Sequence, residues 1–144
     1  MAQILSEYLQ QKSEVDVLEL KAKDESSSFL SQCRRAFWHK RVEIEPGKFD
    51  LKSYDLVCIG TPVWAFAPAP AINAYLDKCF GLERKEAVLF TTYGSGTGNG
   101  RCLNYMQKIL SKKSAGVFRR FSIQQFKIND KEFVLSKIQE ALNK

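Results

Sequence analysis

The segment YDLVCIGTPVWA, residues 54–65, carries the strongest structural signal in the sequence. Its apolar run from Leu56 to Ile59 ends in Gly60. A short continuous apolar run bounded by a turn residue is typical of a strand buried on both faces of a parallel sheet. The segment therefore predicts an α/β fold, in which helices cover both faces of the sheet.

A second apolar run, Glu86 to Thr92, leads into the glycine-rich stretch YGSGTGNG. Between the two runs, residues 70–80 have helical spacing, with a proline at the start and Gly81 as the predicted C-cap. A strand, a helix and a strand in this order predict a right-handed βαβ unit. Residues 56–59 and 88–90 are therefore expected to be adjacent parallel strands.

Apolar periodicity predicts the remaining elements of the chain. Further helices are predicted over residues 2–11, 27–40 and 100–114, and a last one that begins at Asn129. Further strands are predicted over residues 15–20 and 117–123, and a connecting loop over residues 42–53. The alternation of helices and strands favours a parallel sheet between two helical layers.

Length and composition restrict the class of protein. The chain has 144 residues, of which 44% are apolar and 26% charged, so we expect one folded domain over residues 1–144 rather than a disordered chain. No apolar run approaches the ~18 residues of a membrane span. The N-terminal sequence MAQILSEYLQQ lacks the basic flank and apolar stretch of a signal peptide. We therefore expect a cytoplasmic protein without a membrane association.

The chain has few residues suited to metal binding or acid–base catalysis. Its four cysteines are more than twenty residues apart, and His39 is the only histidine. This spacing fits neither a zinc site nor a disulfide framework, and it suits a reducing compartment. A nucleophile–histidine–carboxylate triad also lacks its parts. We predict no catalytic residue and no metal site.

The positive net charge, +6 with a pI of about 9.2, raises the question of nucleic-acid binding. Basic and aromatic residues alternate over residues 34–41. Such a stretch occurs in nucleic-acid surfaces, but it is more often a solvated helix face above core aromatics. We therefore favour a protein without a nucleic-acid partner.

Two loops follow the predicted buried strands, over residues 60–70 and 91–100. In parallel α/β sheets, ligands bind at the carboxyl ends of the strands. In the first loop, Trp64 is suited to stack on a planar ligand, and the Thr61 hydroxyl and the backbone N–H groups to bond its polar edge. The alternative is that Trp64 packs under the following helix. The second loop has four glycines in ten residues, which allow a close approach of the backbone to a ligand.

The segments YDLVCIGTPVWAFAPAPAINAYL and AVLFTTYGSGTGNG resemble the flavodoxin-like family, and more narrowly its short members. The resemblance extends over about residues 1–143. It implies a three-layer α/β/α fold whose parallel sheet has the strand order 2-1-3-4-5. It also implies FMN as the cofactor, held with its ring between the two loops. The residues that it assigns to the cofactor are Thr61, Pro62, Val63, Trp64, Ala65, Thr92, Tyr93, Gly94, Ser95 and Gly96.

The resemblance further implies a function in electron transfer or in the reduction of small acceptors. In that chemistry the protein adjusts the redox properties of the flavin through stacking, hydrogen bonds and charge. It supplies no catalytic acid or base. If the chain is an enzyme, the expected class is an FMN-dependent oxidoreductase similar to quinone reductases. Flavodoxins that shuttle electrons are typically acidic, so a pI of about 9.2 favours a small-molecule acceptor over a basic partner protein.

The sequence departs from the family at its start. Family members begin with a buried strand and a Thr/Ser-Gly-Asn-Thr loop that holds the FMN phosphate, and this sequence contains neither. The segment Thr97–Gly100 resembles the missing loop, but it follows a different strand. We therefore expect FMN binding to be weak or absent, and we keep as the alternative function a flavin-free, truncated domain that acts as an interaction module.

The missing first strand of the 2-1-3-4-5 order would lie between residues 15–20 and 56–59. Three explanations stay open at this point: the natural start lies upstream, the two flanking strands pair directly, or a second chain fills the gap. An exposed apolar sheet edge favours pairing with another chain. We therefore also consider a homo-oligomer formed through this edge.

Overall fold

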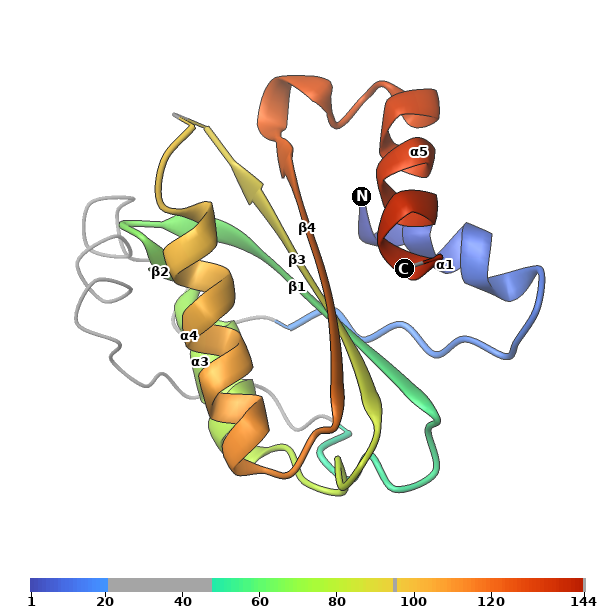
Figure 1. Cartoon of the computed structure of the whole chain (residues 1–144), viewed down its shortest axis with the longest axis vertical. Coiled ribbons are helices and arrows are strands. Elements are labelled where there is room, and N and C mark those ends of the chain that lie inside the picture. The colour runs from blue at the N-terminus through green and yellow to red at the C-terminus, as the bar shows by residue number, and fades with distance from the viewer. Residues whose placement is uncertain (21–47, 95, 144) are drawn as a thin grey trace.

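The structure is a computed structural model that describes residues 1–20, 48–94 and 96–143 (Figure 1). The predicted α/β class is confirmed. In chain order, the described elements are α1 (Ala2–Gln10), β1 (Leu56–Trp64), β2 (Ala67–Pro68), α3 (Pro70–Lys78), β3 (Glu86–Tyr93), α4 (Asn99–Lys112), β4 (Val117–Gln124), a 3-10 turn (Gln125–Lys127) and α5 (Lys131–Leu142). The predicted helix over residues 27–40 and the start of the predicted loop over residues 42–53 lie outside the described residues.

The sheet has the strand order β2-β1-β3-β4. β1 pairs with β3 in parallel, with Cys58 opposite Val88 and Gly60 opposite Phe90. β3 pairs with β4, also in parallel. The predicted adjacent parallel strands are therefore confirmed. Both are apolar because helices bury them from both sides.

Helices cover both faces of the sheet (Figure 1). On one face, α3 and α4 pack on Val57, Ile59 and Leu89. On the other face, α1 and α5 pack on Val88 and Phe90, together with residues of β4. Successive residues of a strand point to opposite faces, so each central strand contributes to both cores. The predicted three-layer arrangement is confirmed.

The predicted strand over residues 15–20 is wrong. These residues form an irregular segment that pairs with no strand in the described structure. The segment is instead attached through side chains, as Asp16 accepts hydrogen bonds from Lys48 and Tyr54. The groove described below separates these residues from the edge of β1, so they form no hydrogen-bonded ladder with it.

The predicted loop after β1 is largely a β-hairpin. β1 continues through Trp64, and β2 returns antiparallel to it, with Val63 opposite Pro68 and Trp64 opposite Ala67. The proline at 62 does not prevent this extension, because its missing N–H is tolerated at the edge of a sheet.

Two predicted helix ends are also corrected. α3 ends at Lys78 with Cys79 as its C-cap, so Gly81, at φ +81°, lies in the turn beyond the helix. The N-cap of α5 is Asp130 rather than Asn129, and its carboxylate accepts a hydrogen bond from the Phe133 N–H. Caps follow local side-chain hydrogen bonds, which sequence spacing locates only within one or two residues.

Residue 60 must be a glycine because the Phe90 ring packs directly against it. A Cβ atom at residue 60 would lie 2.0 Å from Cε2 of the Phe90 ring. That ring is buried and stacks on Phe121 with a centroid distance of 5.4 Å, so it has little freedom to move.

We therefore expect Gly60→Ala to lower the free energy of unfolding by about 1–3 kcal/mol, the usual cost of overpacking a core. Urea denaturation of Gly60→Ala, Phe90→Leu and the double variant measures this. The double variant should be less destabilised than the sum of the single ones, because the smaller side chain makes room for the new methyl group. Additive effects would show that the two residues do not interact.

Candidate functional site

The parallel pairing of β1 and β3 brings the two predicted loops to one rim of the sheet. Pro62 lies opposite Thr92 in the register, so both strands end at the same level. Pro62, Gly94 and Gly96 are exposed there, and Thr92 and Tyr93 are half-buried. Ser95 lies outside the described residues. The predicted meeting of the two loops is therefore confirmed.

The hairpin turn on this rim has an unusual backbone. Its two residues, Ala65 and Phe66, both have positive φ, at 48° and 68°. Two-residue turns of this kind match the twist of the flanking strands but favour asparagine and glycine. Alanine and phenylalanine adopt such angles at a cost in conformational energy, and strained residues of this kind cluster at functional sites.

Phe66 joins the first loop to the second. Its side chain is 46% exposed, and a Cβ atom added to Gly98 would lie 2.5 Å from its Cδ1 atom. Gly98 has φ +90° and is the N-cap of α4. A glycine at this position therefore allows the Phe66 ring to lie directly against the start of α4. Phe66 was not predicted as a site residue, and the only sequence signal was an aromatic residue next to the predicted loop.

Trp64 lies at the end of β1, half-buried and paired with Ala67. Val63 is half-buried and packs on the core formed with α3 and α4. Ala65, in the turn, is half-buried as well. The rim thus combines an indole, the exposed Phe66 ring and the half-buried Tyr93 ring with the backbone of a glycine-rich loop.

The Thr61 hydroxyl stabilises the hairpin. Thr61 is 4% exposed, and its Oγ1 accepts a hydrogen bond from the Ala69 N–H at 2.9 Å. The same hydroxyl donates to the Pro62 carbonyl oxygen at 3.0 Å. These bonds attach the end of β1 to the N-cap residue of α3. Thr61 is therefore a residue that positions the loop.

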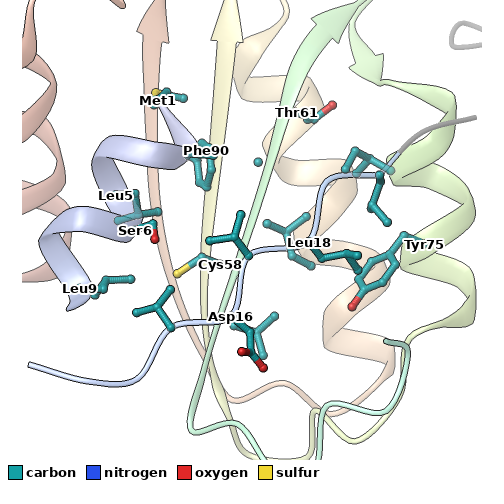
Figure 2. Close-up of a pocket in the computed structure, with 18 of the residues that line it drawn as sticks. Met1, Leu5, Ser6, Leu9, Asp16, Leu18, Cys58, Thr61, Tyr75 and Phe90 are labelled. Atoms are coloured by element: carbon teal, nitrogen blue, oxygen red, sulfur yellow. The ribbon is translucent and has the colours of Figure 1, made fainter. Parts of the chain in front are cut away.

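A groove of about 590 Å³ extends from this rim along β1 (Figure 2). Thr61, Pro62 and Thr92 line its end at the rim. Most of its length lies beside β1, between that strand and the irregular segment over residues 15–20. Its volume falls within the usual range of ligand pockets, ~300–1,000 Å³. The sequence had indicated a free sheet edge here, but not a groove.

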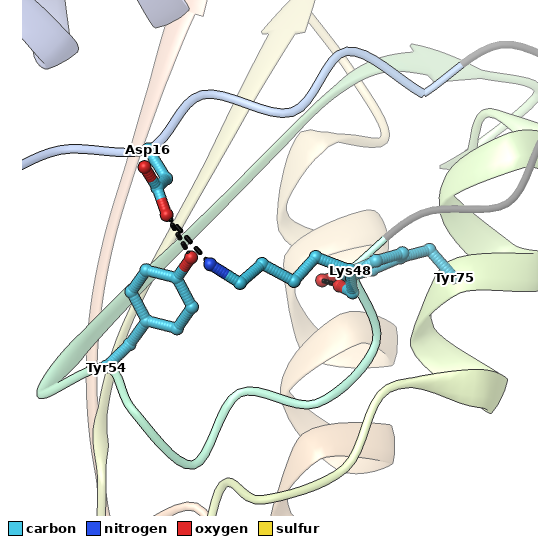
Figure 3. A network of polar contacts seen from close by, with 4 residues as sticks. All are labelled: Asp16, Lys48, Tyr54 and Tyr75. Carbon is cyan, nitrogen blue, oxygen red and sulfur yellow. Dashed lines mark hydrogen bonds and ion pairs between the residues drawn. The ribbon is translucent and has the colours of Figure 1, made fainter.

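A polar network fixes the far wall of the groove (Figure 3). Asp16 accepts hydrogen bonds from the Tyr54 hydroxyl and from Lys48 Nζ, the latter at 3.0 Å. The Tyr75 hydroxyl donates to the Lys48 carbonyl oxygen at 2.8 Å. The Tyr54 hydrogen bond, followed by the Lys48 ammonium, lowers the pKa of Asp16. The irregular segment is therefore held to the rest of the fold by a charged side chain over the physiological pH range.

The described cysteines are free and buried or half-buried. Burial, with a smaller effect of the Glu86 carboxylate, raises the pKa of the Cys58 thiol to about 12. Burial likewise raises the pKa of Cys102 to about 12. These groups are protonated thiols at neutral pH, so they lack the thiolate character that nucleophilic catalysis needs.

Over the ranges that the structure covers, no group of three or more histidine, cysteine, aspartate or glutamate side chains is arranged to hold a metal ion. No helix in those ranges has the length and apolarity needed to cross a membrane. The rim instead offers aromatic faces and exposed backbone, which suit a planar organic ligand.

A family model described as flavodoxin matches residues 8–118 of the chain. No curated protein matches the sequence. Among solved structures, a provisionally assigned flavoprotein from Bacteroides uniformis is 17% identical, with a TM-score of 0.68, and the match covers 99% of this chain and 88% of that protein. A flavoprotein from Lactobacillus acidophilus, solved in complex with FMN, is 19% identical with a TM-score of 0.54. The match covers 90% of this chain and 89% of that protein.

A third solved structure, a provisionally assigned flavoprotein from Bacteroides eggerthii, is 20% identical with a TM-score of 0.51. The match covers 85% of this chain and 69% of that protein. These similarities establish the fold of the chain.

Thr61→Val tests the positioning role of the hydroxyl. The substitution keeps the shape of the side chain but removes both hydrogen bonds and leaves the Ala69 N–H without its acceptor. We expect the free energy of unfolding to fall by about 1–2 kcal/mol. Thermal denaturation measures the effect, and hydrogen exchange should show faster exchange at Ala69. Unchanged exchange at Ala69 would contradict the role.

Proposed function

Because the chain belongs to the flavodoxin family, we propose that it holds a flavin, in the first place FMN, at the rim where β1 and β3 end. The observation that carries the proposal is the contact of the two loops, in which the Phe66 ring lies against Gly98. This contact gives a site with aromatic side chains on one loop and accessible backbone on the other.

The residues of the rim fit the ring system of a flavin better than its phosphate. Trp64, Phe66 and Tyr93 offer aromatic faces, and exposed Gly94 and Gly96 allow the backbone to approach the polar edge of the ring. For the phosphate, the sequence supplies no segment like the family's Thr/Ser-Gly-Asn-Thr loop other than Thr97–Gly100, at the start of α4. The ring is therefore the part of the cofactor that this chain is built to bind.

A bound flavin would supply one- or two-electron redox chemistry. The chain would position the ring by stacking and shield one of its faces, and its backbone N–H groups would tune the electron density of the ring. We propose the reduction of small acceptors, as in quinone reductases, rather than electron transfer to a basic protein. The positive net charge of +6 supports this choice, since it disfavours docking on a basic partner.

The affinity for FMN tests the proposal directly. Each hydrogen bond to a charged phosphate contributes about 1.5–3 kcal/mol, so the loss of three of them removes on the order of three to six decades of affinity. We expect this chain to bind FMN weakly, and riboflavin about equally well. Parallel titrations of the purified protein, followed by flavin fluorescence, measure both affinities.

Sub-micromolar binding of FMN with a strong preference over riboflavin would contradict this expectation. It would indicate a phosphate site, and Thr97→Ala with Asn99→Ala would then test the start of α4. Binding of neither flavin would contradict the proposed function itself.

Trp64 is expected to stack on the flavin ring. A Trp38→Phe background leaves Trp64 as the only tryptophan, so quenching of its fluorescence by riboflavin reports contact at this residue. Aromatic stacking contributes ~0.5–1.5 kcal/mol beyond area burial, so Trp64→Ala should weaken flavin binding by about tenfold. Phe66→Ala is the matched comparison on the same hairpin. Unchanged affinity in Trp64→Ala would assign Trp64 to the core.

The alternative function, a flavin-free domain that acts as an interaction module, is favoured by one observation. The groove beside β1 lies mostly outside the rim. The two functions are distinguished by the same riboflavin titration, because an interaction module would show no flavin binding and no quenching of Trp64.

A further inference from the structure

The positive net charge of the chain comes from one continuous stretch of sequence. Residues 87–129, which run from β3 through α4 and β4, contain seven basic side chains and no acidic one. The rest of the chain contains 15 basic and 16 acidic side chains, so its charges nearly cancel. The net charge of +6 is therefore concentrated in one part of the fold, which has no carboxylate side chain of its own.

Three of these seven cations have partners that explain their positions. Lys113 donates to two carbonyl oxygens at the end of α3. Arg119 pairs with Glu86 and donates to carbonyl oxygens at the end of α5. The Lys127 ammonium lies 4.5 Å from the centre of the Phe133 ring. These three side chains therefore stabilise the fold.

The other four cations gather on one exposed face of α4. Arg101, Lys108 and Lys112 share this face with Asn104, because three or four residues separate each from the next. Arg120 of β4 joins them, since its Nη1 donates to Asn104 Oδ1 at 2.7 Å. Within the described residues, the three cations of α4 have no ion pair, hydrogen bond or ring contact. This face of α4 therefore carries positive charge that the fold does not use.

The helix dipole favours only one of the three cations of α4. Lys112 lies in the last turn, where a positive charge is favourable. Lys108 lies one turn earlier, where the effect has largely faded. Arg101 lies in the first turn, where a positive charge is unfavourable, and no acidic residue of that turn offsets it. The stability of the helix therefore does not explain the arrangement.

A groove of about 680 Å³ lies between this face of α4 and β4, and we call it the α4–β4 groove. Within the described residues, its lining has no carboxylate and no apolar or aromatic side chain. Each side chain of the lining carries at least one hydrogen-bond donor. The lining consists of Asn104, Gln107, Lys108, Ser111, Lys112 and Arg120.

The hydrogen bond between Arg120 and Asn104 orients further donors for a ligand. A guanidinium group has five N–H donors, and this bond uses one of them. Asn104 accepts through its oxygen, so both N–H donors of its amide nitrogen are left. The groove is therefore rich in donors and positive charge and poor in acceptors.

We propose that the α4–β4 groove binds a small ligand that carries two or more linked phosphate groups. Such a ligand concentrates several negative charges and many acceptor oxygens in a small volume, which complements three cations and a lining of donors. Lys108 and Lys112 would bind phosphate as point charges, and Arg120 as a planar fork. The inference goes beyond the proposed flavin function and does not depend on whether a flavin is bound at the rim.

A nucleic acid fits the α4–β4 groove less well. Proteins that bind single strands without sequence preference stack the bases on aromatic side chains, and the described lining has none. The four cations of this face would neutralise at most about four phosphates of a duplex, and binding through so few contacts is weak at physiological salt. A compact ligand instead brings its charges together inside the groove.

An acidic protein surface also fits less well. The buried centre of a protein–protein interface is enriched in aromatic side chains and depleted in lysine. The described lining of the groove has two lysines and no apolar side chain. A ligand made of linked phosphates needs no apolar contact, because all of its contacts are polar or charged.

The test uses inorganic tripolyphosphate, titrated calorimetrically into the full chain at ~0.15 M salt. Citrate is the matched control ligand, because it carries several negative charges on carboxylates, and orthophosphate tests the need for linked phosphates. Lys108→Gln, Lys112→Gln and Arg120→Gln each remove one cation of the groove. Lys12→Gln is the control variant, because it removes an exposed cation next to α1, on the opposite face of the sheet.

We expect tripolyphosphate to bind, and citrate and orthophosphate to bind about tenfold more weakly or less. Each groove variant should weaken tripolyphosphate binding by about tenfold, the usual effect of losing one hydrogen bond to a charged group. Lys12→Gln should leave the affinity nearly unchanged. The substituted side chains are exposed, so the variants should fold normally. Their affinity for riboflavin should equal that of the unsubstituted chain, because the groove lies outside the rim.

Four results would overturn the proposal. They are the absence of tripolyphosphate binding at this salt concentration, an equal loss of affinity in Lys12→Gln, equal affinity for citrate, and tighter binding of a short DNA duplex that displaces tripolyphosphate. The second would indicate attraction by the net charge alone. The third would indicate a surface for the carboxylates of an acidic protein, and the last a surface for nucleic acid.

Discussion

The parallel ladder between β1 and β3 is the constraint on which the rest of the structure depends. It sets Pro62 opposite Thr92, and so brings two segments thirty residues apart to one rim. Because both strands are buried between helices, the residues that leave the sheet at the rim are the first that can reach a ligand. The same ladder occupies only one edge of β1, so the position of the groove also follows from it.

The rim and the groove are physically continuous. Thr61, Pro62 and Thr92 line the end of the groove and also belong to the loops proposed to hold a flavin. Thr61 connects the two regions, because its hydroxyl bonds the hairpin to the residue before α3.

Local patterns predicted much of the fold, and they failed where a feature depended on a distant neighbour. The apolar runs of β1 and β3 identified the buried strands, since burial on both faces leaves a continuous signal in the sequence. Residues 15–20 also carry apolar residues but form no strand, because a groove separates them from the edge of β1. The hydrogen bond that the Thr61 hydroxyl accepts from the Ala69 N–H, eight residues away, was not predicted. Phe66 was missed because its role arises from contact with Gly98.

The sequence by itself determined the α/β class, the parallel pair of central strands and the rim at which the two loops meet. These follow from hydrophobic periodicity and glycine placement, which act over a few residues. Only the tertiary structure decided that the first loop is a strained hairpin, that Phe66 joins it to the second loop, and that an apolar groove lies beside β1. Each of these depends on which groups approach from distant parts of the chain, and hydrogen bonding and close packing act only between groups that the fold brings into contact.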